Sequence, residues 1–204
     1  IHDMFNPEDH VNQNIFLNRF VDDRVQAAKE KSAHRDIEII TRLKSSSPVR
    51  MPIEPLKKTV DGLIRNAIEN TPDQGIVEIL VHPRGKGVMF TVKDHGIGLT
   101  QEAQKRIFEG FFATQDTLKY SSKQPYDFNA GGKGADLLRM KIFSERYNFK
   151  IEMTSQRCHK LPETADICPG SKEGCHKMSG EPCNGMTIVT CFFPFSHILP
   201  QQPH

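Results

Sequence analysis

The chain has 204 residues, 37% of them hydrophobic and 25% charged, and its formal net charge is +2. This composition fits one globular domain with a real core, and the near-neutral charge gives no reason to expect a nucleic-acid partner. No apolar run approaches the roughly 18 residues of a transmembrane helix, and the N-terminal stretch is too polar for a signal peptide. We expect a cytoplasmic domain and, because the chain begins with Ile1, a piece of a longer protein.

The first half of the chain predicts two helices and one strand. Apolar residues at helical spacing indicate a helix within residues 11–31, and the alternation in 36-DIEIITRL-43 indicates a strand. Pro55 suits the first position of a second helix, which the Thr71-Pro72 pair ends. The apolar stripe of that helix comprises Leu56, Val60, Leu63, Ile64, Ala67 and Ile68.

The second half adds strands and helices in an order typical of a sandwich. Two strands, two helices and two further strands are predicted at 76–81, 88–93, 101–109, 134–147, 149–154 and 186–193. This order predicts an α+β fold, in which helices cover one face of a mixed sheet in a two-layer α/β sandwich.

Two segments interrupt this pattern. The polar loop at about 112–131 is far longer than the usual loop of about five residues, so we expect either a functional lid or disorder. Residues at about 158–185 contain four of the five cysteines and look inserted. Three alternatives stay open for these cysteines: a structural Zn²⁺ site, disulfides or redox-active thiols, and unpaired loop cysteines. The four are Cys158, Cys168, Cys175 and Cys183.

Three short motifs could carry chemistry. Asn66 and Asn70 are four residues apart on the polar face of the second helix, and a carboxamide oxygen suits a Mg²⁺ ion that carries phosphates. In 92-VKDHGIGL-99 a strand ends at Asp94, which could accept a hydrogen bond from an adenine amino group. In 129-NAGGKGADLLRMK-141 glycines precede a helix whose amides, with Lys133, could bind phosphate. Each motif alone also fits an ordinary solvated turn or helix face.

Together, and with 107-IFEGFF-112 between the last two, these motifs resemble the ATP-binding domain of sensor histidine kinases, which shares its wider fold family with gyrase, the Hsp90 chaperones and MutL. The resemblance runs from about Asp36 to Phe195. It implies a Bergerat-type fold with a mostly antiparallel sheet, and ATP and Mg²⁺ as cofactors. The ATP-contacting residues that it implies are Asn66, Asn70, Asp94, Gly96, Ile97, Gly98, Phe108, Phe112, Gly132, Lys133, Gly134, Leu137 and Thr187.

The resemblance also implies roles for some of these residues. In that family the counterpart of Asp94 holds the adenine amino group, directly and through a water that the counterpart of Thr187 also contacts. Asn66 would ligate Mg²⁺, and the long loop would close over the triphosphate.

By the same resemblance, the chain would transfer the γ-phosphoryl group of Mg²⁺-ATP to a histidine on a separate domain. That histidine is expected upstream, so no catalytic residue is assigned within this chain. Residues 1–30 would be the end of a dimerisation helix or a linker, and 31–204 the kinase domain. Expected partners are the dimerisation and phosphoacceptor domain of the same protein, a second copy in a homodimer, and a response regulator. The parent could be a membrane-bound sensor with this domain in the cytosol.

The sequence departs from the family pattern at Gly62, at Glu69 and Asn70, and at Asp136. Hydrolysing relatives need a carboxylate at the position of Gly62 to activate water. Asp136 replaces the last glycine of the phosphate motif, where a negative charge is unfavourable beside a triphosphate. Two alternative functions therefore stay open: a degenerate nucleotide-binding or scaffold domain without turnover, and an ATPase of the gyrase or chaperone type.

Overall fold

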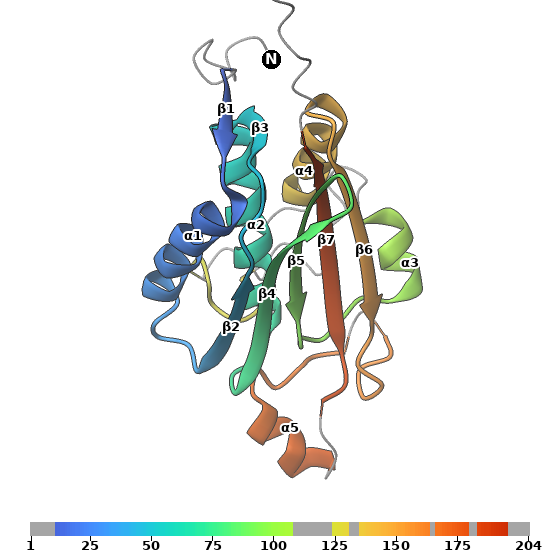
Figure 1. The fold of residues 1–204 in the computed structure, drawn as a ribbon. Helices are drawn as coiled ribbons and strands as arrows, with labels where there is room; N and C mark the ends of the chain where they lie inside the picture. Colours follow the sequence, from blue (N-terminus) through green and yellow to red (C-terminus); the bar gives the residue numbers. More distant parts are fainter. Residues whose placement is uncertain (1–10, 108–123, 131–134, 164–165, 180–182, 196–204) are drawn as a thin grey trace, which may run out of the picture.

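A computed structural model describes residues 11–107, 124–130, 135–163, 166–179 and 183–195. The main sheet forms one layer, and the helices that pack on it form a second (Figure 1). In chain order the elements are β1 (Asn12–Ile15), α1 (Leu17–Lys31), β2 (Ile37–Leu43), β3 (Val49–Pro52), α2 (Ile53–Asn70), β4 (Gly75–Arg84), β5 (Gly87–Asp94), α3 (Gln101–Arg106), α4 (Ala135–Arg146), β6 (Lys150–Gln156), α5 (Lys172–Ser179) and β7 (Met186–Pro194).

The main sheet has five strands in the order β2-β4-β5-β7-β6. β2 runs parallel to β4, and the other neighbouring pairs are antiparallel. The register places Asp94 at the end of β5 opposite Thr187 near the start of β7. The predicted α+β sandwich with a mixed, mostly antiparallel sheet is therefore confirmed.

The core lies between this sheet and the helices α1, α2 and α4. In β4, Val77, Ile79 and Val81 are fully buried, whereas the residues between them are partly exposed, so one face of the strand points into the core. α2 buries the whole apolar stripe predicted for it. Each leucine, isoleucine or valine side chain of the stripe contributes roughly 1.5–3 kcal/mol when it leaves water, so this face fixes how α2 lies on the sheet.

α1 belongs to the same core, and its buried residues are Leu17, Val21, Val25 and Ala28. Its Arg24 also donates two hydrogen bonds to the carboxylate of Asp61 in α2, at 2.5 and 2.8 Å. Residues 17–31 thus pack with the sandwich. The assignment of residues 1–30 to the end of a dimerisation helix or a linker stays a prediction.

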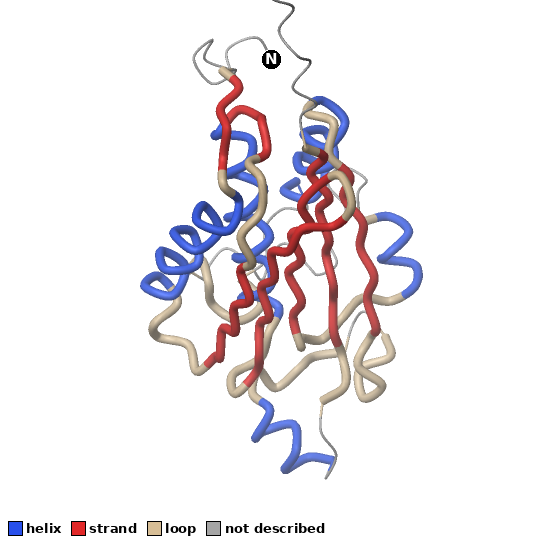
Figure 2. The backbone as a smooth tube through the Cα atoms, in the orientation of Figure 1, coloured by secondary structure: helices blue, strands red, loops and turns tan. Residues whose placement is uncertain are grey.

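The sequence patterns missed three elements. β1 and β3 form a separate two-stranded antiparallel sheet, so the first helix begins at Leu17 and not near residue 11. α5 lies within the cysteine-rich insertion, which connects the paired strands β6 and β7. The small sheet and α5 lie towards opposite ends of the molecule (Figure 2). Among the described residues, no helix is both long and apolar enough to cross a bilayer.

Candidate functional site

The candidate site begins with Asp94, the last residue of β5. The residue is 6% exposed, and its Oδ1 accepts a hydrogen bond from the amide of Gly96 at 3.1 Å. Burial raises the pKa of this carboxyl to about 7, although hydrogen bonds from the backbone at Gly96 and Thr187 favour the ionised form. In its ionised form this buried carboxyl can accept a hydrogen bond from a ligand amino group.

The loop after Asp94 is packed tightly against other segments, and its glycines make that packing possible. A β carbon on Gly96 would lie 2.2 Å from the carbonyl oxygen of Asn70, at the end of α2. Gly98 has a φ of +65°, and a β carbon there would lie 1.9 Å from the carbonyl oxygen of Gln156. These glycines therefore serve contacts within the protein. That they also contact ATP, as the family resemblance implies, stays a prediction.

Ser155 links this loop to the last two strands. Its hydroxyl lies 2.9 Å from that of Thr187 and accepts a hydrogen bond from the amide of Leu99, also at 2.9 Å. It also lies 2.9 Å from the carbonyl oxygen of Met186. Thr187 is thus held beside Asp94, its partner in the β5–β7 ladder. Sequence reasoning missed Ser155 because a serine within a strand carries no distinguishing pattern.

The two predicted asparagines lie in the last turns of α2, and both are partly exposed. The side-chain amide of Asn70 donates a hydrogen bond to the backbone carbonyl of Asn66 at 2.7 Å. This bond engages the nitrogen of Asn70 and leaves its carboxamide oxygen for a ligand. Asn66 keeps a carboxamide on the accessible face of the helix, which is the neutral oxygen donor that Mg²⁺ accepts.

Gly62 has a packing role that the sequence did not reveal. It is buried, and a β carbon on it would lie 2.4 Å from Cε of Met140 in α4. The adjacent carboxylate, Asp61, is engaged by Arg24 of α1. Hydrolysing relatives need a carboxylate at this position, whereas here Gly62 lies against Met140 where α2 and α4 meet.

Asp136, the unexpected residue of the glycine motif, is compensated by an arginine. It forms an ion pair with Arg65 of α2, and Arg139 lies 3.4 Å from its other carboxylate oxygen. Arg65 also lies 3.8 Å from Glu69. Asp136 and Glu69, the two acidic residues that depart from the family pattern, thus share the cation Arg65. This positive charge reduces the repulsion that the two carboxylates would exert on a triphosphate. Leu137, the next residue, packs against the core.

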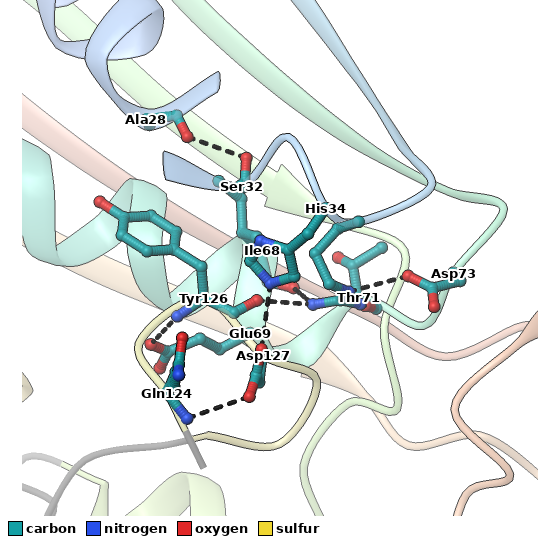
Figure 3. A network of polar contacts seen from close by, with 11 residues as sticks. Ala28, Ser32, His34, Ile68, Glu69, Thr71, Asp73, Gln124, Tyr126 and Asp127 are labelled. Atoms are coloured by element: carbon teal, nitrogen blue, oxygen red, sulfur yellow. Dashed lines mark hydrogen bonds and ion pairs between the residues drawn. The ribbon is translucent and has the colours of Figure 1, made fainter. Parts of the chain in front are cut away.

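Residues 124–130, at the end of the predicted lid, are anchored to the sandwich (Figure 3). Glu69 is 3% exposed and accepts a hydrogen bond from the amide of Tyr126 at 3.1 Å, while burial raises the pKa of Glu69. Nε2 of His34 lies 3.0 Å from Oδ1 of Asp127. These contacts tie the segment to α2 and to the turn after α1.

Arg35 completes this anchor from the same turn. Its side chain is 5% exposed, forms an ion pair with Asp73 at 2.8 Å, and donates to the carbonyl oxygens of Tyr126 and Thr71, both at 2.8 Å. A single arginine therefore joins three segments that are distant in sequence. Sequence reasoning missed Arg35 because nothing local marks these contacts.

All five cysteines lie in the described part of the chain, and none of them forms a disulfide. The Sγ atoms of Cys158 and Cys183 are 4.0 Å apart, and Cys168, whose pKa burial raises, interacts electrostatically with the other three thiols of the insertion. Within the described residues, no group of three His, Cys, Asp or Glu side chains is arranged to hold a metal ion. The zinc alternative therefore has no support there, and the close pair favours the thiol alternative.

Five predicted ATP contacts lie outside the described residues and stay predictions. They are Phe108, Phe112, Gly132, Lys133 and Gly134.

Sequence comparison relates the chain to known proteins. A profile of the histidine kinase-, DNA gyrase B-, and HSP90-like ATPase family matches residues 52–197. Sensor-like histidine kinase SenX3 of Mycobacterium tuberculosis is 30% identical over 142 residues, which cover 70% of this chain and 33% of SenX3. Sporulation kinase A of Bacillus subtilis is 39% identical over 61 residues, which cover 30% of this chain and 10% of that kinase. The chain thus spans about a third of SenX3 and less of sporulation kinase A.

Solved structures share the fold. The mycobacterial sensor histidine kinase MprB superposes with a TM-score of 0.59 at 15% identity, covering 90% of this chain and 97% of that one. The catalytic domain of histidine kinase ThkA superposes with a TM-score of 0.61 at 19% identity, and the match covers 91% of this chain and 99% of the ThkA chain. At these identities the likeness establishes the architecture.

Proposed function

The chain belongs to the histidine kinase-, DNA gyrase B- and HSP90-like ATPase family, and from this membership we propose that it is the ATP-binding catalytic domain of a two-component sensor histidine kinase. It transfers the γ-phosphoryl group of ATP to a histidine on a separate domain. The observation that carries the proposal is the buried carboxyl of Asp94, held beside Thr187 at the edge of the loop that the family uses for adenine.

In this proposal the described residues bind and orient the nucleotide. Asp94 accepts a hydrogen bond from the adenine amino group, and Ser155 keeps Thr187 in place beside it. The loop of Gly96–Gly98 forms one wall of the adenine pocket. Asn66 holds Mg²⁺, which when bound neutralises phosphate charge, and Leu137 contributes an apolar contact from the start of α4.

Transfer needs little covalent chemistry from this domain. A nitrogen of the incoming histidine bonds to the γ-phosphorus, and ADP leaves with the electron pair of the broken bond. The domain contributes by positioning ATP and by balancing charge, and Arg65 does the latter for Asp136. The ATPase alternative is disfavoured, because the position at which hydrolysing relatives need a carboxylate is Gly62, packed against Met140.

The proposal also covers the binding partners of the domain and its cellular location. The partners are the dimerisation and phosphoacceptor domain of the parent protein, a second copy of the parent, and a response regulator that receives the phosphoryl group. The domain works in the cytoplasm, where ATP is supplied.

The nucleotide site is tested by calorimetry with ATP and Mg²⁺. The unmodified chain should bind, and Asp94→Asn should weaken binding by about tenfold or more, because a charge-assisted hydrogen bond is worth roughly 1.5–3 kcal/mol. Asp23→Asn, which changes an exposed aspartate of α1, is the matched control and should bind normally.

Transfer is tested in the parent protein with ATP labelled at the γ position. Acid-labile label on a histidine supports the kinase proposal. An unmodified chain that does not bind ATP, or that binds it equally well after Asp94→Asn, contradicts the proposed site. Binding without transfer in the parent would favour the scaffold alternative.

A further inference from the structure

Two thiols meet where the cysteine-rich insertion leaves the sheet and returns to it. Cys158 lies two residues after β6, and Cys183 lies three residues before β7. Their Sγ atoms are 4.0 Å apart. Cys158 is 1% exposed, whereas Cys183 is partly exposed. The insertion therefore begins and ends at neighbouring thiols, one buried and one accessible.

Both residues contact the loop that follows Asp94. The amide of Cys158 donates a hydrogen bond to the carbonyl oxygen of Ile97 at 2.9 Å, and Sγ of Cys183 lies 4.0 Å from the carbonyl oxygen of Gly96. The backbone near Cys183 is equally close, since a β carbon on Gly185 would lie 2.3 Å from that same carbonyl oxygen. A covalent link at this point would fasten the ends of the insertion across the loop.

We propose that Cys158 and Cys183 are a thiol modification site that forms a reversible disulfide and thereby holds the Gly96–Gly98 loop in its nucleotide-binding form. The effect on nucleotide binding rests on the proposed function, whereas the bond itself does not. A disulfide has an S–S distance of about 2.05 Å, so side-chain rotation has to bring the two sulfurs roughly 2 Å closer.

The oxidant belongs to the class of small disulfides, such as oxidised glutathione. The thiolate of Cys183, the accessible residue, attacks one sulfur of that disulfide, and one small thiolate leaves. The thiolate of Cys158 then attacks Sγ of Cys183, and the second small thiolate leaves. The two protons of the protein thiols pass to the leaving thiolates, and the small disulfide takes up the two electrons. A reducing thiol reverses both steps.

The bond is tested on the folded chain in glutathione buffers from reducing to oxidising. Because burial raises the pKa of Cys183, the exchange is run at about pH 8.5, where more thiolate is present. Remaining thiols are alkylated after an acid quench, and linked peptides are identified by mass spectrometry. We expect a mass loss of about 2 Da in the intact chain before alkylation, and after alkylation and digestion a peptide that joins Cys158 to Cys183. Cys183→Ser should abolish both changes, and Cys168→Ser, in the same insertion, should keep them.

Calorimetry with ATP on the reduced and oxidised chain then tests the consequence. The oxidised chain should bind several-fold more tightly, because the loop is ordered in advance, and the two conditions should give equal affinity in Cys183→Ser. If the reduced and the oxidised unmodified chain bind ATP with equal affinity, the proposed effect of the disulfide on nucleotide binding is wrong.

Other results would overturn the modification site itself. These are full alkylation of both thiols in the oxidising buffer, a link made to Cys168 or Cys175 instead, and stoichiometric Zn²⁺ that protects the thiols. The mapped bond does not depend on nucleotide. A chain that forms the bond but binds no ATP in either state would therefore contradict the proposed function and not the bond.

Discussion

The buried carboxyl of Asp94 should make the protein less stable as the pH rises towards neutrality. Its pKa is about 7 in the folded protein, against 3.8 for the same group in an ordinary setting. Between these values the folded protein keeps a proton that the unfolded chain has lost, so rising pH favours the unfolded chain. The stabilisation from the protonated carboxyl is complete below about pH 4 and is lost by about pH 7.

The size of this effect follows from the shift. Each pKa unit corresponds to 1.36 kcal/mol, so a shift of about three units changes the free energy of unfolding by about 4 kcal/mol in all. About 2 to 3 kcal/mol of this should be lost between pH 5 and pH 8, since part of the loss has already occurred below pH 5. Asp94→Asn removes the titrating group and should remove this share of the pH dependence.

The assay is urea unfolding of the chain without nucleotide at four pH values from 5 to 8. The difference in unfolding free energy between Asp94→Asn and the unmodified chain should shift by about 2 to 3 kcal/mol in favour of the variant as the pH rises. Asp23→Asn, at an exposed position, should follow the unmodified chain throughout. If the curves of Asp94→Asn and the unmodified chain stay parallel, Asp94 does not titrate in this range and the reasoning is wrong.

Three further predictions concern the contacts around the site. Arg35→Met removes the donor from the carbonyl groups of Thr71 and Tyr126 and the partner of Asp73, so the unfolding free energy in urea should fall by about 2 to 3 kcal/mol, and proteolysis near residues 124–130 should accelerate. In a double-mutant cycle of unfolding free energies, Gly62→Ala and Met140→Ala should show a coupling of roughly 1 kcal/mol, because the β carbon added at position 62 displaces the methionine. Additive changes in unfolding free energy would contradict the contact. Arg65→Met leaves Asp136 with the more exposed Arg139 as its cation, so ATP binding should weaken about tenfold in calorimetry, whereas Arg65→Lys should lose less.

Local pattern was enough to predict most of the fold. The apolar stripe of α2 and the alternation in β4 each reflect burial on one face, and that periodicity is visible in the residues themselves. β1 and β3 escaped prediction for the opposite reason. β1 has only four residues, three of them exposed, and it is held by pairing with a segment that ends at Pro52. Pairing between distant segments leaves little periodic signal in either one.

The candidate site divides in the same way. Asp94, Asn66 and the glycines could be named as candidates because motifs mark them in the sequence. Arg35 and Ser155 could not, because each acts by joining segments that meet only in the folded chain. The packing role of Gly98 was likewise hidden, since it depends on the backbone of Gln156 in β6.

The departures from the family pattern are connected through the contact between α2 and α4. Gly62 admits Met140, and one turn further along α2 Arg65 reaches Asp136 at the start of α4. A carboxylate at position 62 would displace the methionine, and a glycine at 136 would leave Arg65 with Glu69 as its remaining acidic neighbour among these contacts. The two changes are therefore complementary, because both bring α4 closely onto α2. In the proposed kinase, this α2–α4 contact lies where hydrolysing relatives need a carboxylate to activate water, and we therefore expect transfer to an incoming histidine to be favoured over hydrolysis.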